Sequence, residues 1–264
     1  MEGCRHIVEK GRGRPVVFLH GWAVDGSFFA PQLALACESI RVIVPDLPGH
    51  GLDQRPGLRP TVESLASALN ELLVRKALHD VVLVGWSMGA LVALEHLRAQ
   101  GSRQVSRLIV IDMTARVIND EGWHLGLASG LDLASADAAA DRMTVDWNAT
   151  SRRVAAALFA EGRRADPALL SYATVRILHN DAAVMAHLWR SLVRCDYRLS
   201  VRDIRLPALI IAGAASQLYR QEVSAWLAQA LPSGRRVLID GAGHAPHMEQ
   251  PNDVNRLIAG FVAE

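Results

Sequence analysis

The sequence contains few cysteines, almost no net charge and no long apolar run. Its three cysteines, Cys4, Cys37 and Cys195, form no Cys-x-x-Cys pair, so the sequence predicts neither a disulfide framework nor a zinc site. The formal net charge of +1 argues against a nucleic acid or another polyanion as partner. No apolar stretch approaches the length of a membrane span, and residues 1–14 lack the apolar core of a signal peptide. We therefore expect a cytoplasmic protein that binds neither membranes nor nucleic acid.

Half of the 264 residues are hydrophobic, which is enough for a sizeable core. Short apolar runs predict strands at residues 16–19, 41–44, 81–84, 108–111, 208–211 and 236–239. Stretches of helical periodicity separate these runs, and the clearest helix is expected to begin after Thr61 as its N-cap. Ser27 is expected to cap another helix that ends near Cys37. The alternation predicts an α/β fold with a mostly parallel central sheet flanked by helices on both faces.

The middle of the chain has a different pattern. Between Met113 and about Ser200 there is no strand-like apolar run, and the sequence is rich in alanine, arginine and aspartate. We interpret residues 113–200 as a helical lid, and residues 1–112 and 201–264 as the core.

A Gly-x-Ser-x-Gly motif occupies residues Gly85–Gly89, directly after the predicted strand at 81–84 and before a helical pattern. A sharp turn between a strand and a helix holds a serine hydroxyl exposed, and the flanking glycines permit the close approach of backbone that such a turn requires. The N-terminus of the helix also directs backbone N–H groups toward developing negative charge. The motif therefore predicts that Ser87 is a nucleophile.

Several histidines are candidates for a base. His244 follows the last predicted strand on the glycine-rich segment Gly241–His244, so it is expected at the same sheet edge as Ser87. His247 is the rival base, whereas His20 and His50 lie in turns and are interpreted as structural. His244 and His247 have His-x-x-His spacing, but no third ligand is evident, so no metal site is predicted.

The order of these motifs resembles that of the α/β-hydrolase superfamily. The matching segments are His20-Gly21, Asp46–Gly51, Gly85–Gly89 and Gly241–His244. Within the superfamily, the segments around Trp22 and Ser87 look like those of the pimeloyl-carrier-protein methyl esterases and related small carboxylesterases. The resemblance implies that Ser87 is the nucleophile, that His244 is the general base and then the acid, and that the N–H groups of Trp22 and Met88 form an oxyanion hole.

The sequence departs from the family pattern at the third member of the triad. Many relatives carry an acid in a Gly-x-x-Asp segment after the strand at 208–211, where this chain has Gly213-Ala214-Ala215-Ser216. Asp112, which ends the strand after the nucleophile's helix, is the expected replacement because that strand end opens on the same sheet edge. Asp120, Glu121 and Asp203 are weaker alternatives.

The walls of the pocket are harder to predict. Trp22 and Trp86 flank the predicted oxyanion hole and either line an apolar pocket or pack against the lid. Leu218 and Tyr219 follow the strand end with the vacant acid position and are expected to reach the pocket from that side.

The leading functional interpretation is a hydrolase of carboxylic esters, thioesters or lactones that needs no cofactor and acts on a small molecule or an acyl group bound to a carrier. An alternative is a cofactor-independent dioxygenase of a quinolone-like ring, which would use His244 and Asp112 without acylating Ser87. Those enzymes tend to carry a histidine just after the first Gly-Trp, where this chain has Ala23-Val24-Asp25. A non-catalytic binding protein with the same fold is the third possibility.

Overall fold

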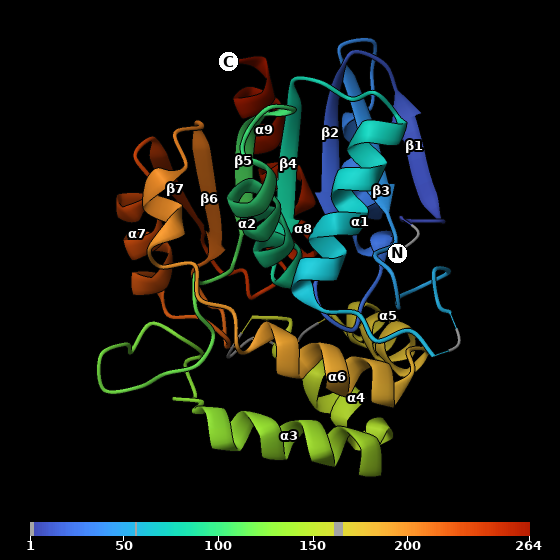
Figure 1. Cartoon of the computed structure of the whole chain (residues 1–264), viewed down its shortest axis with the longest axis vertical. Helices are drawn as coiled ribbons and strands as arrows, with labels where there is room; N and C mark the ends of the chain where they lie inside the picture. The colour runs from blue at the N-terminus through green and yellow to red at the C-terminus, as the bar shows by residue number, and fades with distance from the viewer. Residues whose placement is uncertain (1–2, 56, 161–165) are drawn as a thin grey trace.

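The computed structural model describes residues 3–55, 57–160 and 166–264. Its centre is a seven-stranded sheet with the order β1-β3-β2-β4-β5-β6-β7, in which β1 is antiparallel to β3 and all other neighbours are parallel (Figure 1). The strands are β1 (Ile7–Gly11), β2 (Arg14–Leu19), β3 (Ile40–Pro45), β4 (Val81–Trp86), β5 (Val105–Ile111), β6 (Ala208–Gly213) and β7 (Gly234–Ile239). The predicted fold class is thus confirmed.

Strand β1 was not predicted from the sequence. It is an edge strand, and its residues are only partly buried or exposed, with Glu9 and Lys10 in its middle. A strand that buries so little has no clear apolar pattern, so it pairs with β3 without a strong local signal.

Helices cover both faces of the sheet, as predicted. On one face lie α1 (Val62–Arg75), α2 (Met88–Gln100) and α7 (Gln221–Ala230), and on the other lie the 3₁₀ helix η1 (Gly26–Leu35), α8 (Pro246–Glu249) and α9 (Pro251–Ala263) (Figure 1). Strand β4 contributes to the core on both faces because its side chains alternate. Leu83 packs on the face covered by α1, α2 and α7, whereas Val82 and Val84 pack on the face covered by η1, α8 and α9.

Two helix starts can be compared with the sequence. Thr61 is the N-cap of α1, as predicted, and forms a capping box with Ser64. The segment expected to be capped by Ser27 is instead a 3₁₀ helix that is capped by Asp25, whose carboxylate accepts from the Ser27 N–H at 2.9 Å. Pro31 lies inside this segment and has no N–H to donate, which disfavours a regular α-helix.

The stretch between β5 and β6 contains the helices α3 (Leu133–Val145), α4 (Trp147–Ala157), α5 (Pro167–Leu178) and α6 (Ala182–Leu192). We call residues 113–200 the cap. Its helices lie across the carboxyl ends of the parallel strands, below the sheet in Figure 1. Among the described residues, no helix combines the length and apolar character needed to cross a bilayer.

Candidate active site

Ser87 lies at the sharp turn between β4 and α2. Its backbone has φ 53° and ψ −125°, which is a strained conformation for a residue with a side chain. Gly85 and Gly89 make the turn possible, because a Cβ on Gly85 would lie 2.4 Å from Ala90 Cα and a Cβ on Gly89 would lie 2.0 Å from the Leu19 carbonyl oxygen. Both glycines of the motif are therefore required by close packing of backbone.

The loop after β2 passes beside Ser87. A Cβ placed on Gly21 would lie 3.3 Å from Ser87 Cβ, so the neighbouring Trp22 is near the predicted nucleophile. Met88 is the first residue of α2, so its N–H has no acceptor within the helix. Both residues of the predicted oxyanion hole therefore lie next to Ser87.

His20 has a structural role in this loop, as the sequence analysis proposed. Its Nε2 accepts from the Leu47 N–H at 2.9 Å, and its Nδ1 donates to the Gly21 carbonyl at 2.9 Å. Burial lowers the pKa of His20, so the ring stays neutral and keeps both hydrogen bonds.

His244 and Asp112 lie in direct contact. Nδ1 of His244 is 2.7 Å from Oδ2 of Asp112, and the two side chains are only 1% and 2% exposed. A carboxylate only accepts hydrogen bonds, so Nδ1 donates and Nε2 keeps the lone pair that a base needs. The weaker acid candidates Asp120, Glu121 and Asp203 are all exposed.

Asp112 has two further hydrogen-bond donors. The hydroxyl of Ser216 donates to Oδ2 at 2.7 Å, and the Gly213 N–H donates to Oδ1 at 3.2 Å. Asp112 itself has φ 42°, an unusual conformation that turns its side chain away from the regular strand direction. The carboxylate is thus held by donors from the end of β6 as well as by His244.

Two side chains hold the His244 loop in place. Trp86 Nε1 donates to the His244 carbonyl at 2.7 Å, and Glu249 accepts from the Gly243 N–H at 2.6 Å. The other oxygen of Glu249 accepts from the Ala160 N–H at 2.9 Å, which connects this loop to the cap. Burial raises the pKa of Glu249.

His247 is unsuited to act as the base. Its ring is fully buried against Trp86, at 4.5 Å between ring centroids, and Phe29, at 4.9 Å. Neither ring nitrogen has a hydrogen-bond partner, and burial, with a smaller contribution from His244, lowers the pKa of His247 to about 3. Within the described ranges, no three His, Cys, Asp or Glu side chains gather into a group that could hold a metal ion.

A mostly apolar cavity of about 130 Å³ opens beside Ser87 and His244. The remaining lining residues come from the loop after β2, the ends of β5 and β6, and the cap: Trp22, Met113, Val117, Leu127, Val154, Ala157, Leu158, Trp189, Leu192, Leu218 and Tyr219. The Tyr219 hydroxyl contacts Met113 Sδ at 3.2 Å, and no charged side chain lines the cavity.

The alpha/beta hydrolase family model matches residues 16–257. The chain belongs to the α/β-hydrolase family. The resemblance inferred from the motifs is therefore confirmed.

Several relatives of this chain are named as esterases. The chain is 32% identical to a pimeloyl-[acyl-carrier protein] methyl ester esterase of Aromatoleum aromaticum, over 94% of this chain and 97% of the relative. It is 27% identical to the enzyme of the same name from Vibrio cholerae, over 91% of each chain.

Solved structures of this fold superpose over most of the chain. An esterase from Exiguobacterium antarcticum has a TM-score of 0.89 at 22% identity, covering 98% of this chain and 95% of that one. A bromoperoxidase from Bacillus anthracis has a TM-score of 0.91 at 23% identity, with the same coverage. At these identities the likeness establishes the α/β-hydrolase fold alone.

The expected pocket residues are found in different surroundings. Leu218 and Tyr219 line the cavity, as expected, whereas Trp86 does not. Trp22, for which the sequence left both the pocket and packing against the lid open, also lines the cavity. Trp86 shares the face of β4 with Val82 and Val84, so its ring is fully buried and stacks on Phe28 at 5.5 Å.

Sequence reasoning missed two supporting residues, Ser216 and Glu249. Ser216 could have been found, because it occupies the position at which the family resemblance leads one to expect an acid. Glu249 left no such signal, since its partners Gly243 and Ala160 are backbone groups on separate loops.

The buried His247 should make the protein less stable in acid. Its pKa is 6.5 ordinarily and about 3 in the fold, so below pH 6.5 the unfolded chain binds a proton that the folded chain does not. The free energy of unfolding should therefore fall as the pH decreases from 6.5 to 3. In His247→Phe the dependence should weaken by up to about 1.4 kcal/mol per pH unit, with ester hydrolysis retained. Urea unfolding between pH 7 and 4 measures the free energy of unfolding at each pH. If His247→Phe shows the same pH dependence as wild type, His247 does not have the lowered pKa.

Proposed function

We propose that this protein hydrolyses carboxylic esters through an acyl-enzyme on Ser87, with His244 as base and Asp112 as acid. The observation that carries the proposal is the 2.7 Å contact between His244 Nδ1 and Asp112 Oδ2, together with the cavity that both His244 and Ser87 line. A nucleophile, a base and a group that orients the base are the parts that acyl transfer requires.

In the proposed reaction, Ser87 Oγ attacks the ester carbonyl as His244 Nε2 removes its proton. The N–H groups of Trp22 and Met88 donate to the oxygen on which negative charge develops, and Asp112 stabilises the imidazolium ring. The C–O bond then breaks, His244 protonates the leaving alcohol, and Ser87 carries the acyl group. Water repeats the cycle and releases the acid. The same parts would cleave a thioester or a lactone.

The cavity suggests which acyl groups are accepted. Its walls are apolar and carry no charged side chain, which favours an uncharged acyl chain next to Ser87. Its volume of about 130 Å³ is close to that of engineered cavities of about 150 Å³ that bind benzene, so it would take about five carbon atoms. A methyl ester attached to an acyl carrier, as in the names of the relatives, would leave the carrier outside this cavity.

Ser87→Ala should abolish both ester hydrolysis and labelling by a fluorophosphonate probe, because the attacking oxygen is absent. Wild type should gain one adduct, located on Ser87 by peptide mapping, and should hydrolyse p-nitrophenyl esters. An unlabelled, inactive wild type that consumes oxygen with a quinolone would support the dioxygenase instead, and one that does neither would support a binding protein.

Asp112→Asn should lower kcat by about 10³- to 10⁴-fold, as loss of the triad acid does elsewhere. The hydroxyl of Ser216 lies 2.7 Å from the same carboxylate oxygen that His244 contacts. The double variant Asp112→Ala/Ser216→Asp should therefore return a carboxylate to His244. Its kcat should be at least about tenfold higher than that of Asp112→Ala, because part of the contribution of the triad acid is restored.

Asp120→Asn is the control for this experiment, since Asp120 is exposed and pairs with Arg116. It should keep the activity of wild type. An Asp112→Asn variant as active as wild type, beside an inactive Asp120→Asn, would show that the acid is assigned wrongly.

Acyl length should affect kcat/KM in a way that reports the cavity. With p-nitrophenyl esters from acetate to dodecanoate, each added methylene should raise kcat/KM by about 4-fold until the cavity is filled, at about five carbons. Longer chains should react less well. Ala157→Leu adds volume to the lining and should move the optimum to shorter chains. A flat profile, or an optimum that Ala157→Leu leaves in place, would contradict this assignment of the acyl site.

A further inference from the structure

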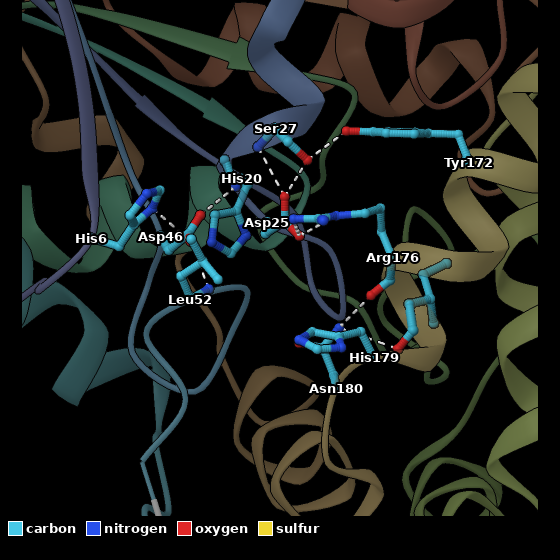
Figure 2. A network of polar contacts seen from close by, with 12 residues as sticks. His6, His20, Asp25, Ser27, Asp46, Leu52, Tyr172, Arg176, His179 and Asn180 are labelled. Carbon is cyan, nitrogen blue, oxygen red and sulfur yellow. Dashed lines mark hydrogen bonds and ion pairs between the residues drawn. The ribbon is translucent and has the colours of Figure 1, made fainter.

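The loop from His20 to Gly26, which we call the oxyanion loop, is attached to the cap by polar contacts. Figure 2 shows Arg176 directed toward Asp25, Tyr172 directed toward Ser27, and Asn180 beside them. The cap residues come from α5 and from the turn that follows it, far from the loop in sequence. None of these side chains lines the cavity beside Ser87.

The first attachment is an ion pair between a buried carboxylate and a partly exposed arginine. Asp25 is 1% exposed, and its Oδ2 accepts from Arg176 Nε at 2.7 Å and from Nη2 at 2.5 Å. Its Oδ1 accepts from the Ser27 N–H at 2.9 Å, and the Tyr172 hydroxyl donates to Ser27 Oγ at 2.5 Å. A buried carboxylate requires such partners, so the end of the oxyanion loop is held where α5 places the guanidinium group.

The second attachment acts next to the predicted oxyanion donor. Ala23, which follows Trp22, has φ 60°, a conformation that residues other than glycine rarely adopt. The buried Asn180 donates from Nδ2 to the Ala23 carbonyl at 2.8 Å, and to the carbonyls of Arg176 and Ile177 at 3.1 and 3.2 Å. Asn180 thus ties the strained residue to the end of α5.

Trp22 is also held through its own side chain. Its indole Nε1 donates to the Met185 carbonyl in α6 at 3.0 Å. The cap therefore contacts both the side chain of Trp22 and the carbonyl of the residue after it. The direction of the Trp22 N–H depends on the same stretch of backbone.

We propose that Asn180 and Arg176 are positioning residues: from the cap, they fix the backbone that carries the Trp22 N–H of the oxyanion hole. The hole is then complete only when the cap packs against the oxyanion loop. This inference rests on the proposed function, because it concerns the Trp22 N–H as an oxyanion donor. A donor must lie about 2.7–3.1 Å from the developing oxyanion, and a misplacement of about 1 Å can cost about 100-fold in rate. A contact distant from the reacting atoms can therefore control kcat.

The test compares Asn180→Ala and Arg176→Met with wild type. Each should lower kcat on a short p-nitrophenyl ester by about 10- to 100-fold while KM changes less than about 3-fold, because the oxyanion is stabilised in the transition state and not in the bound substrate. A trifluoromethyl ketone, whose carbonyl carbon accepts Ser87 Oγ, mimics that oxyanion. Its inhibition constant should rise by the same factor as kcat/KM falls.

Two further variants keep the test decisive. Arg190→Met is the matched control, since Arg190 is a cap arginine of similar exposure that pairs with Asp141 inside the cap and does not reach the oxyanion loop. It should leave kcat and ketone inhibition unchanged. In Arg176→Met the buried carboxylate of Asp25 loses its partner, and the protein could become too unstable to fold. In that case Asp25→Asn/Arg176→Met removes the unpaired charge and should show the same loss of kcat. Amide hydrogen exchange at residues 22–25 should accelerate in the Asn180 and Arg176 variants only.

The outcomes separate this inference from the proposed function. If wild type neither hydrolyses esters nor is labelled on Ser87, the proposed function fails and this inference fails with it. If wild type is active and the Asn180 and Arg176 variants keep kcat and ketone inhibition within about 2-fold, as the Arg190 control should, only the positioning role is overturned. A rise in KM alone, with unchanged ketone inhibition, would mean that these residues merely stabilise the cap.

Discussion

The left-handed backbone of Ser87 is the constraint on which the rest of the site depends. A residue with φ 53° at the end of a strand directs its side chain out of the sheet and lets α2 begin immediately. The helix then packs so tightly against the end of β2 that Gly89 has no room for a Cβ. The same packing brings Gly21 beside Ser87, and with it the loop that carries Trp22. The strain at one residue therefore explains the glycines around it.

A parallel sheet explains why the acid can come from β5. The strand ends after β4, β5, β6 and β7 lie along one edge, so Ser87, Asp112, Ser216 and His244 meet although they are scattered along the chain. After the end of β6, the hydroxyl of Ser216 donates to Asp112. In the proposed triad the end of β5 supplies the acid, and the segment after β6 supplies a hydrogen bond to that acid.

The cap has an apolar side and a polar side. Toward Ser87, it presents the apolar side chains of Val154, Leu158 and Trp189 to the cavity. Toward the oxyanion loop, α5 presents Arg176, and the turn after it presents Asn180, in buried polar contacts. Buried polar groups tolerate displacement poorly, since each lost partner leaves an unsatisfied group. The polar side therefore gives the cap one defined position over the strand ends.

Local sequence patterns were enough to predict the alternation of strands and helices, the Thr61 cap, the helical middle of the chain, and Ser87 and His244 as candidates. Each of these features depends on a pattern of a few neighbouring residues, because short-range sterics and hydrogen bonding determine the local structure. The other features depend on tertiary packing. The edge strand β1, the burial of Trp86 on the far face of β4, the hydrogen bond from Ser216 to Asp112 across 104 residues, and that from Asn180 to Ala23 across 157 residues depend on which elements pack together. No local pattern encodes such contacts, because they depend on the order of strands in the sheet and on how the cap packs against it.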